Sequence, residues 1–140
     1  MASYKKLFDA YDALTPIQTE GLGKKYAVEI TKYFQSISTS EEDIYKFFVD
    51  LFKLAISADL NLSNAEHKFY NTIIGDDIGY DAFFEKTNYG GSENFINEMK
   101  GKIQKYPVEV KNYMYSLILI ILVSDGPVND KEKAFFKKFY

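Results

Sequence analysis

Apolar residues recur at intervals of three and four along almost the whole chain. Leu7, Phe8, Tyr11 and Leu14 begin the pattern, and this spacing places them on one face of an α-helix. No segment shows the alternation of apolar and polar residues that predicts a half-buried β-strand. We therefore expect an all-α protein.

The starts of the expected helices carry capping signals. Thr15, Pro16 and Gln18 form a capping box with a first-turn proline. Ser40 precedes three acidic residues, which the positive end of a helix dipole favours. Further starts are indicated at Ser63, Ser92, Pro107 and Asn129. The predicted helices cover residues 16–34, 41–58, 63–74, 92–105, 107–124 and 129–140, with a short helix near residues 82–84.

The chain also contains an internal repeat with a period of 66 residues. This shift places residues 54–59 on residues 120–125, and it places Glu66, Phe69 and Tyr70 on Glu132, Phe135 and Phe136. Two pseudo-repeated helical units, approximately residues 24–75 and 90–140, follow from this match. With an additional N-terminal helix, they predict a single domain over residues 1–140, a compact bundle of about seven helices.

The repeated corner resembles a known family. Residues 124–132 read SDGPVNDKE, which is similar to the pattern A-D-G-x-[IV]-x-x-x-E that occurs twice in the all-helical TerB-like tellurite-resistance domain. Residues 58–66 read ADLNLSNAE and depart from the pattern at Leu60, where glycine is usual. The resemblance covers residues 41–140. It implies a cytoplasmic, non-enzymatic module of stress or defence pathways, in some relatives with metal binding and membrane-linked complexes.

The four acids of the repeated corner, Asp59, Glu66, Asp125 and Glu132, have two interpretations. In the structural one, each Asp accepts backbone N–H groups of the following turn, and each Glu, at the third position of the next helix, reaches back to the cap residue. In the functional one, the same carboxylates coordinate Ca²⁺ or Mg²⁺. The loops are not EF-hands, because the sixth and twelfth positions lack the required glycine and acid.

Composition excludes several other classes. The chain has 140 residues, 46% of them hydrophobic, enough to build a core. Its net charge is −3, and all 17 basic residues are lysines, so no arginine fork is available to read a nucleic acid. The absence of cysteine and the single histidine, His67, exclude a zinc site. The longest apolar run has seven residues, residues 117–123, so no transmembrane segment is expected.

Two polar segments favour structural interpretations. Asp76, Asp77 and Asp81 predict a solvated acidic turn before a helix. Residues 21–25, GLGKK, lack P-loop spacing and predict a turn or a frayed helix start. His67 is expected to be solvent-facing or half-packed, and no nucleophile-elbow sequence supports a hydrolase, which we keep only as a remote alternative.

The aromatic residues suggest a partner surface. Tyr80, Phe83, Phe84 and Tyr89 gather in the least regular segment, and exposed aromatics dominate interface energetics. We therefore expect a module that binds another protein. The phenylalanines of the last helix dock either onto the chain's own core or onto a second subunit of a homodimer.

Overall fold

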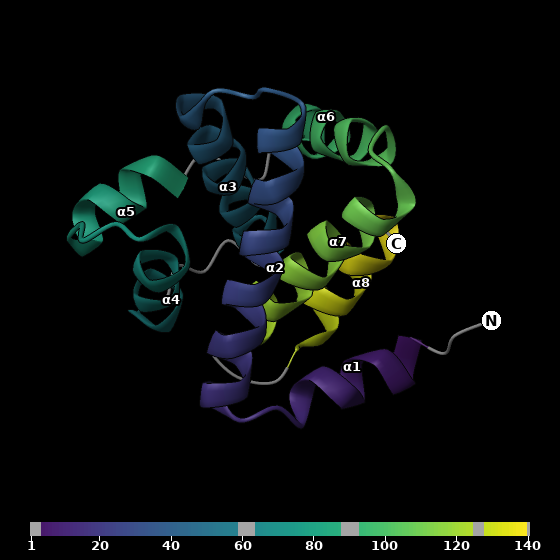
Figure 1. The fold of residues 1–140 in the computed structure, drawn as a ribbon. Helices are drawn as coiled ribbons and strands as arrows, with labels where there is room; N and C mark the ends of the chain where they lie inside the picture. The colour runs from purple at the N-terminus through teal and green to yellow at the C-terminus, as the bar shows by residue number, and fades with distance from the viewer. Residues whose placement is uncertain (1–3, 59–63, 88–92, 125–127, 140) are drawn as a thin grey trace.

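The computed structural model describes residues 4–58, 64–87, 93–124 and 128–139, and their regular structure is entirely α-helical (Figure 1). The expected all-α fold is therefore confirmed. These residues form eight helices: α1 (Tyr4–Asp12), α2 (Pro16–Ser36), α3 (Glu41–Ile56), α4 (Asn64–Ile74), α5 (Tyr80–Thr87), α6 (Glu93–Gln104), α7 (Val108–Val123) and α8 (Asp130–Phe139).

The most apolar helix, α7, lies at the centre of the molecule. It contacts α1, α2, α3, α6 and α8, and its contact with α2 is the most extensive between any two of the described helices. Residues 117–122 are consecutively buried, which is the pattern of a helix covered on all sides rather than on one face. Buried residues from all eight helices join in one hydrophobic cluster.

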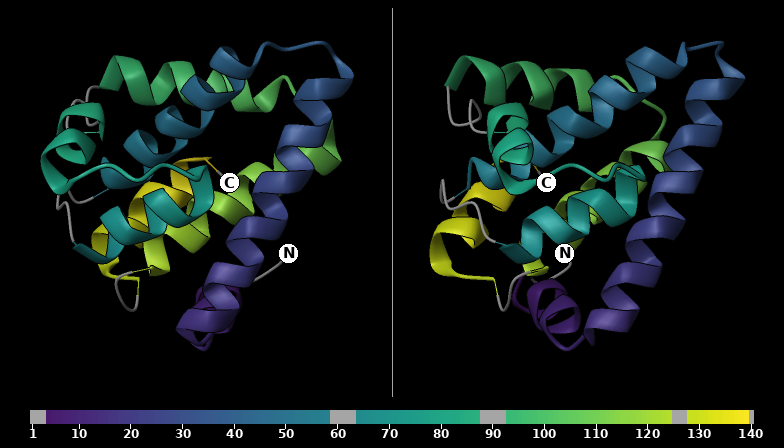
Figure 2. Two further views of the ribbon diagram at one scale, coloured as in Figure 1. Left: turned by 60° about the vertical axis from the view of Figure 1, so that its left-hand side comes forward. Right: turned by 90° about the vertical axis from the view of Figure 1, so that its left-hand side faces the viewer.

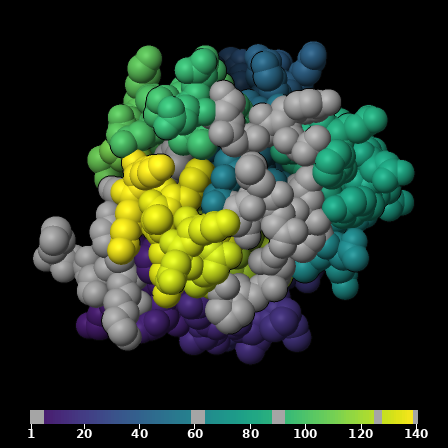
Figure 3. All heavy atoms as spheres, turned by 180° about the vertical axis from the view of Figure 1, so that it is seen from behind, coloured from purple at the N-terminus to yellow at the C-terminus, as the bar shows by residue number. Residues whose placement is uncertain are grey.

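The other helices surround α7 at different levels. In Figure 1, α2 crosses in front of α7, α1 lies below them, and α4 and α5 lie on the left, beyond α2. Figure 3, from behind, shows α8 on the surface, with α6 above it and α1 and α2 below. Phe8 of α1 meets Phe136 of α8 edge to face, with ring centroids 5.8 Å apart. This contact packs α1 against α8.

Helix starts follow the capping signals closely. Thr15 caps α2 in a reciprocal capping box with Gln18, and Ser40 accepts the Asp43 N–H at the start of α3. Both predicted caps are thus confirmed. Pro107, predicted as the first residue of this helix, is instead the N-cap of α7, which begins one residue later at Val108. Ser63 and Ser92 lie outside the described residues.

The structure differs from expectation at two helices. Residues 21–25 neither turn nor fray, because α2 continues through both glycines. A Cβ on Gly23 would meet Ile73 Cδ1 and Phe69 Cζ, each at 2.8 Å, so this glycine permits the close approach of α4. The segment after Gly75 forms the eight-residue helix α5 rather than a single turn. The described residues therefore contain eight helices instead of about seven.

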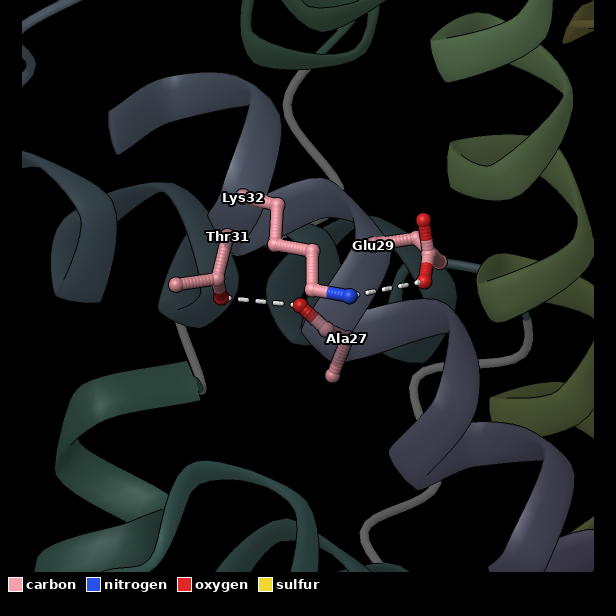
Figure 4. Close-up of polar contacts among 4 residues, drawn as sticks. All are labelled: Ala27, Glu29, Thr31 and Lys32. Atoms are coloured by element: carbon pink, nitrogen blue, oxygen red, sulfur yellow. Dashed lines mark hydrogen bonds and ion pairs between the residues drawn. The ribbon is translucent and has the colours of Figure 1, made fainter. Parts of the chain in front are cut away.

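The middle of α2 shows polar side chains that bond within their own helix (Figure 4). The Thr31 hydroxyl donates to the Ala27 carbonyl at 2.8 Å, and Lys32 Nζ lies 3.5 Å from Glu29 Oε1. Lys32 is mostly exposed, and such surface pairs contribute little to stability. These contacts support α2 locally.

None of the described helices is both long enough and apolar enough to cross a membrane.

Candidate functional site

The best-defined acid of the repeated corner is Glu132, the third residue of α8. Its Oε1 accepts the Asn129 N–H at 3.0 Å, and Asn129 Oδ1 accepts the Glu132 N–H at 2.8 Å. This is the reciprocal capping box of the structural interpretation. For Glu132 that interpretation is confirmed.

Glu66 occupies the corresponding third position of α4 and is equally buried, with 6% of its surface exposed, as for Glu132. A buried carboxylate needs hydrogen-bonding partners to offset lost hydration. Asp59 and Asp125, the other two candidate ligands, lie outside the described residues. Within the described part of the chain, no three or more Asp, Glu, His or Cys residues gather as a metal site would require.

The candidate aromatic surface divides into an inner and an outer part. Phe83 is completely buried, so its predicted place on a partner surface is wrong. It points towards α4, where its ring stacks on His67 and lies 5.3 Å from the Tyr70 ring. Tyr80 and Phe84 are 36% and 39% exposed, with centroids 6.5 Å apart. Tyr89 lies outside the described residues.

Asn71 and His67 fix the loop that precedes α5. The Asn71 side chain donates to the Ile78 carbonyl at 3.0 Å and accepts the Ile78 N–H at 3.3 Å. His67 Nε2 lies 2.7 Å from the same carbonyl. His67 is therefore half-packed, as expected, and it holds α5 against α4.

Asp76 links this loop to α3 and α4. Its Oδ2 accepts hydrogen bonds from the Tyr45 hydroxyl at 2.8 Å and the Tyr70 hydroxyl at 3.2 Å, and the two hydroxyls are 3.1 Å apart. Burial, together with the hydrogen bonds to Tyr45 and Asp76, raises the pKa of Tyr70 far above its ordinary value. The prediction of a solvated turn is therefore wrong for Asp76, which is partly buried and hydrogen-bonded to α3 and α4.

The remaining acids give α5 a negative outer face. Asp81 and Glu85 on α5, and Asp77 just before it, are exposed, as are Tyr80 and Phe84. The one basic residue of α5, Lys86, is half-buried, and its ammonium lies 5.4 Å from the centre of the Tyr45 ring. The surface of α5 therefore combines two aromatic rings with carboxylates.

Sequence reasoning missed Tyr45, Tyr70 and Asn71. Tyr45 and Tyr70 lie 25 residues apart on different helices, and only the approach of α3 to α4 brings them to Asp76. The acidic turn at Asp76 was the one signal for these residues. A carboxylate in a half-buried loop needs hydrogen-bond donors nearby, and tyrosine hydroxyls can supply them.

No family model, curated protein or solved structure matches this chain. By its fold the chain belongs to the all-α class. Its exposed aromatic residues on α5 are Tyr80 and Phe84, which we name the α5 pair.

Proposed function

We propose that this chain is a non-enzymatic helical module that binds another protein through the α5 pair. The observation that carries the proposal is the exposure of Tyr80 and Phe84 on a helix whose inner residue, Phe83, is fully buried. Aromatic rings held on a fixed helix lose little conformational entropy on binding. A prepared aromatic surface of this kind suits protein recognition.

The surrounding charge indicates the chemistry of the partner. Asp77, Asp81 and Glu85 flank the pair, so the best complement is a lysine- or arginine-rich segment that also carries apolar residues. Opposite charges at the rim of an interface accelerate association and select partners. Binding should accordingly weaken as salt concentration rises.

We place the module in a TerB-like, cytoplasmic setting in a stress-response or defence pathway, akin to tellurite resistance. The pseudo-repeat supports this proposal. Helices α3 and α7 both have 16 residues, and α4 and α8, which begin at Asn64 and Asp130, each carry a buried Glu as third residue. Their inward aromatics also correspond: Phe69 and Tyr70 in α4, Phe135 and Phe136 in α8.

Two alternatives receive less support. Binding of Ca²⁺ or Mg²⁺ by the repeated acids competes with the capping bond that Glu132 makes to Asn129. A hydrolase would need His67 as a base, whereas His67 Nε2 contacts the Ile78 carbonyl and its ring packs on Phe83. Both side chains fit structural roles.

The test starts with a pull-down of binding proteins and continues with the purified partner. We expect Phe84→Asp to reduce the affinity for the partner by about tenfold or more. A central aromatic residue at an interface typically contributes about 2 kcal/mol or more to binding. Val28→Asp is the matched control, because Val28 is an apolar residue of α2, 50% exposed and not part of the α5 pair. Far-UV circular dichroism must show that both variants remain folded.

Three outcomes would contradict the proposal: equal losses for both variants, a partner whose contact segment is acidic, or affinity that rises with salt. Sedimentation of the purified chain, with and without Phe84→Asp, tests whether a second copy occupies the same surface. Melting with and without added Ca²⁺ or Mg²⁺ tests the metal alternative, which predicts a rise in Tm.

A further inference from the structure

A cavity of about 440 Å³ opens between α1, α2, α4 and α7, and none of its described lining residues belongs to α5. Its walls come from the end of α1, the first turns of α2, one face of α4 and the end of α7. The volume falls in the range of small-molecule sites, which is roughly 300–1,000 Å³. It is large enough for a ligand with an aromatic or branched aliphatic body.

The geometry of α2 and α4 explains why this space exists. The two helices approach most closely where Gly23 faces Phe69 and Ile73. Figure 2 shows that the distance between α4 and α2 increases from this contact towards the N-terminal end of α4. The diverging helices leave a wedge, and Val123 at the end of α7 lies in it.

The walls combine apolar surface with hydroxyl groups. Leu14, Phe69 and Val123 contribute aliphatic and aromatic surface. Thr19 and Thr72 add hydroxyl groups from opposite walls. This composition, mostly apolar with a few polar groups, is typical of sites for small organic molecules.

Acidic side chains outnumber basic ones among the described residues that line the cavity. Asp12 and Glu20 both line it, against one lysine, Lys68, on the α4 wall. Helices α1 and α7 end at the cavity, and α2 and α4 begin there. The partial charges of these helix ends oppose one another, so the side chains decide the charge of the cavity.

Asp12 is held in place by the fold. Its Oδ1 accepts the Val128 N–H at 3.0 Å, and a carboxylate has further lone pairs available for a second donor. Glu20 pairs with Lys24 at 3.2 Å, but both side chains are more than half exposed. A pair of that kind is weak, so Glu20 can also receive a cationic ligand.

We propose that this cavity binds a small organic cation, an ammonium or amidinium group on an apolar body. The cationic group would lie near Asp12 and Glu20, and the apolar body would contact Leu14, Phe69 and Val123. The ring of Tyr11, which also lines the cavity, offers an additional cation–π surface. The inference is independent of the α5 pair.

The test compares three probes that share one body: 3-phenylpropylamine, 3-phenylpropanol and 3-phenylpropanoate. Binding to the full chain is followed by two-dimensional NMR, with the amides of Thr19, Ala65 and Val123 as reporters. We expect the amine to bind best and the carboxylate worst, with dissociation constants that differ by about tenfold. Equal affinities, a preference for the carboxylate, or no shifts at millimolar probe would overturn the proposal.

Two pairs of variants locate the site. Glu20→Gln should weaken amine binding severalfold and leave alcohol binding unchanged, whereas Glu98→Gln, an exposed acid on α6, should change neither. Ala65→Phe narrows the cavity and should abolish binding of every probe. Ala134→Phe, the same change at an exposed position of α8, should not. Equal effects within either pair would mean that the probes bind elsewhere and would refute the assignment.

Discussion

Glu132 shows how a residue can resemble a metal ligand while acting as a helix cap. Its carboxylate accepts the Asn129 N–H, and Asn129 accepts the Glu132 N–H in return. The spacing of cap and acid is therefore sufficient to explain why an acid stands at the third position of α8.

Removing that acceptor should destabilise the chain. We expect Glu132→Ala to lower the free energy of unfolding by about 1–2 kcal/mol, because the Asn129 N–H loses its partner. Glu132→Gln should cost less than half as much, since glutamine also completes a capping box. Urea denaturation measures both. A loss for Gln as large as that for Ala would argue that the negative charge, as in a cation site, is what matters.

Tyr26 gives the protein a dependence on alkaline pH. Burial, followed by the hydrogen bond with Tyr11, raises the pKa of Tyr26 to about 12. The pKa of a tyrosine in the unfolded chain is about 10. The folded state thus holds this proton more tightly than the unfolded state, and the resulting stability is lost as pH rises from about 10 to about 12.

Tyr26→Phe should therefore reduce the loss of stability over this pH interval. The variant has no phenolic proton at the site, so its free energy of unfolding should fall less steeply than that of the unmodified chain. Urea midpoints on both sides of pH 10 supply the comparison, and any constant offset from the lost hydroxyl cancels in it. Parallel curves for the two proteins would contradict the prediction.

At the scale of elements, α2 contains two glycines with opposite roles. Gly21 has no atom within 4 Å of an added Cβ, whereas a Cβ on Gly23 would meet Phe69 and Ile73 at 2.8 Å. Glycine inside a helix is unfavourable unless the space is needed. Gly23 is needed, because it sets how closely α4 approaches α2.

The two alanine substitutions should consequently differ in sign. Gly21→Ala should raise the free energy of unfolding by about 0.5–1 kcal/mol through helix propensity. Gly23→Ala should lower it by about 1–3 kcal/mol, because the buried Phe69 ring must move. Thermal or urea unfolding measures both. Stabilisation by Gly23→Ala would show that α4 can retreat without cost.

The attachment of α5 depends on Asp76. Asp76→Ala would leave the Tyr45 and Tyr70 hydroxyls without their shared acceptor, and we expect hydrogen exchange in α5 to accelerate while α7 stays protected. Asp77→Ala is the matched control at the adjacent, exposed acid. Similar exchange in both variants would mean that the contacts of Phe83, His67 and Asn71 hold α5 without Asp76.

At the scale of the whole molecule, α7 links most other helices into one core. Leu117 is completely buried there, while Val108, in the first turn of the same helix, is 67% exposed. We expect Leu117→Ala to cost about 2–5 kcal/mol and to shift the unfolding of every helix together. Val108→Ala should change stability by less than about 0.5 kcal/mol. A Leu117→Ala variant that loosened α7 alone would contradict a single cooperative core.

Much of the fold was predictable because its signals are local. The caps at Thr15, Ser40 and Asn129 and the apolar spacing between them define where helices begin and which class the protein belongs to. A capping residue and the N–H group it accepts are only a few positions apart, so the sequence contains the whole interaction.

Burial on α5 was not predictable in the same way. Phe83 and Phe84 are neighbours of identical chemistry, yet Phe83 is fully buried and Phe84 is 39% exposed. Which ring faces inward depends on where His67 and Tyr70 of α4 lie. An eight-residue helix also has too few turns to show a clear apolar stripe.

The sequence alone determined the all-helical class, the positions of most helix starts and the capping-box spacing of Asn129 and Glu132, because each depends on residues within one or two turns of each other. Tertiary structure alone decided that Asp76 receives two tyrosine hydroxyls, that Gly23 brings α4 against α2, and that a cavity opens beyond that contact. These features depend on the packing of helices distant in sequence, where contact geometry, rather than residue type, sets the outcome.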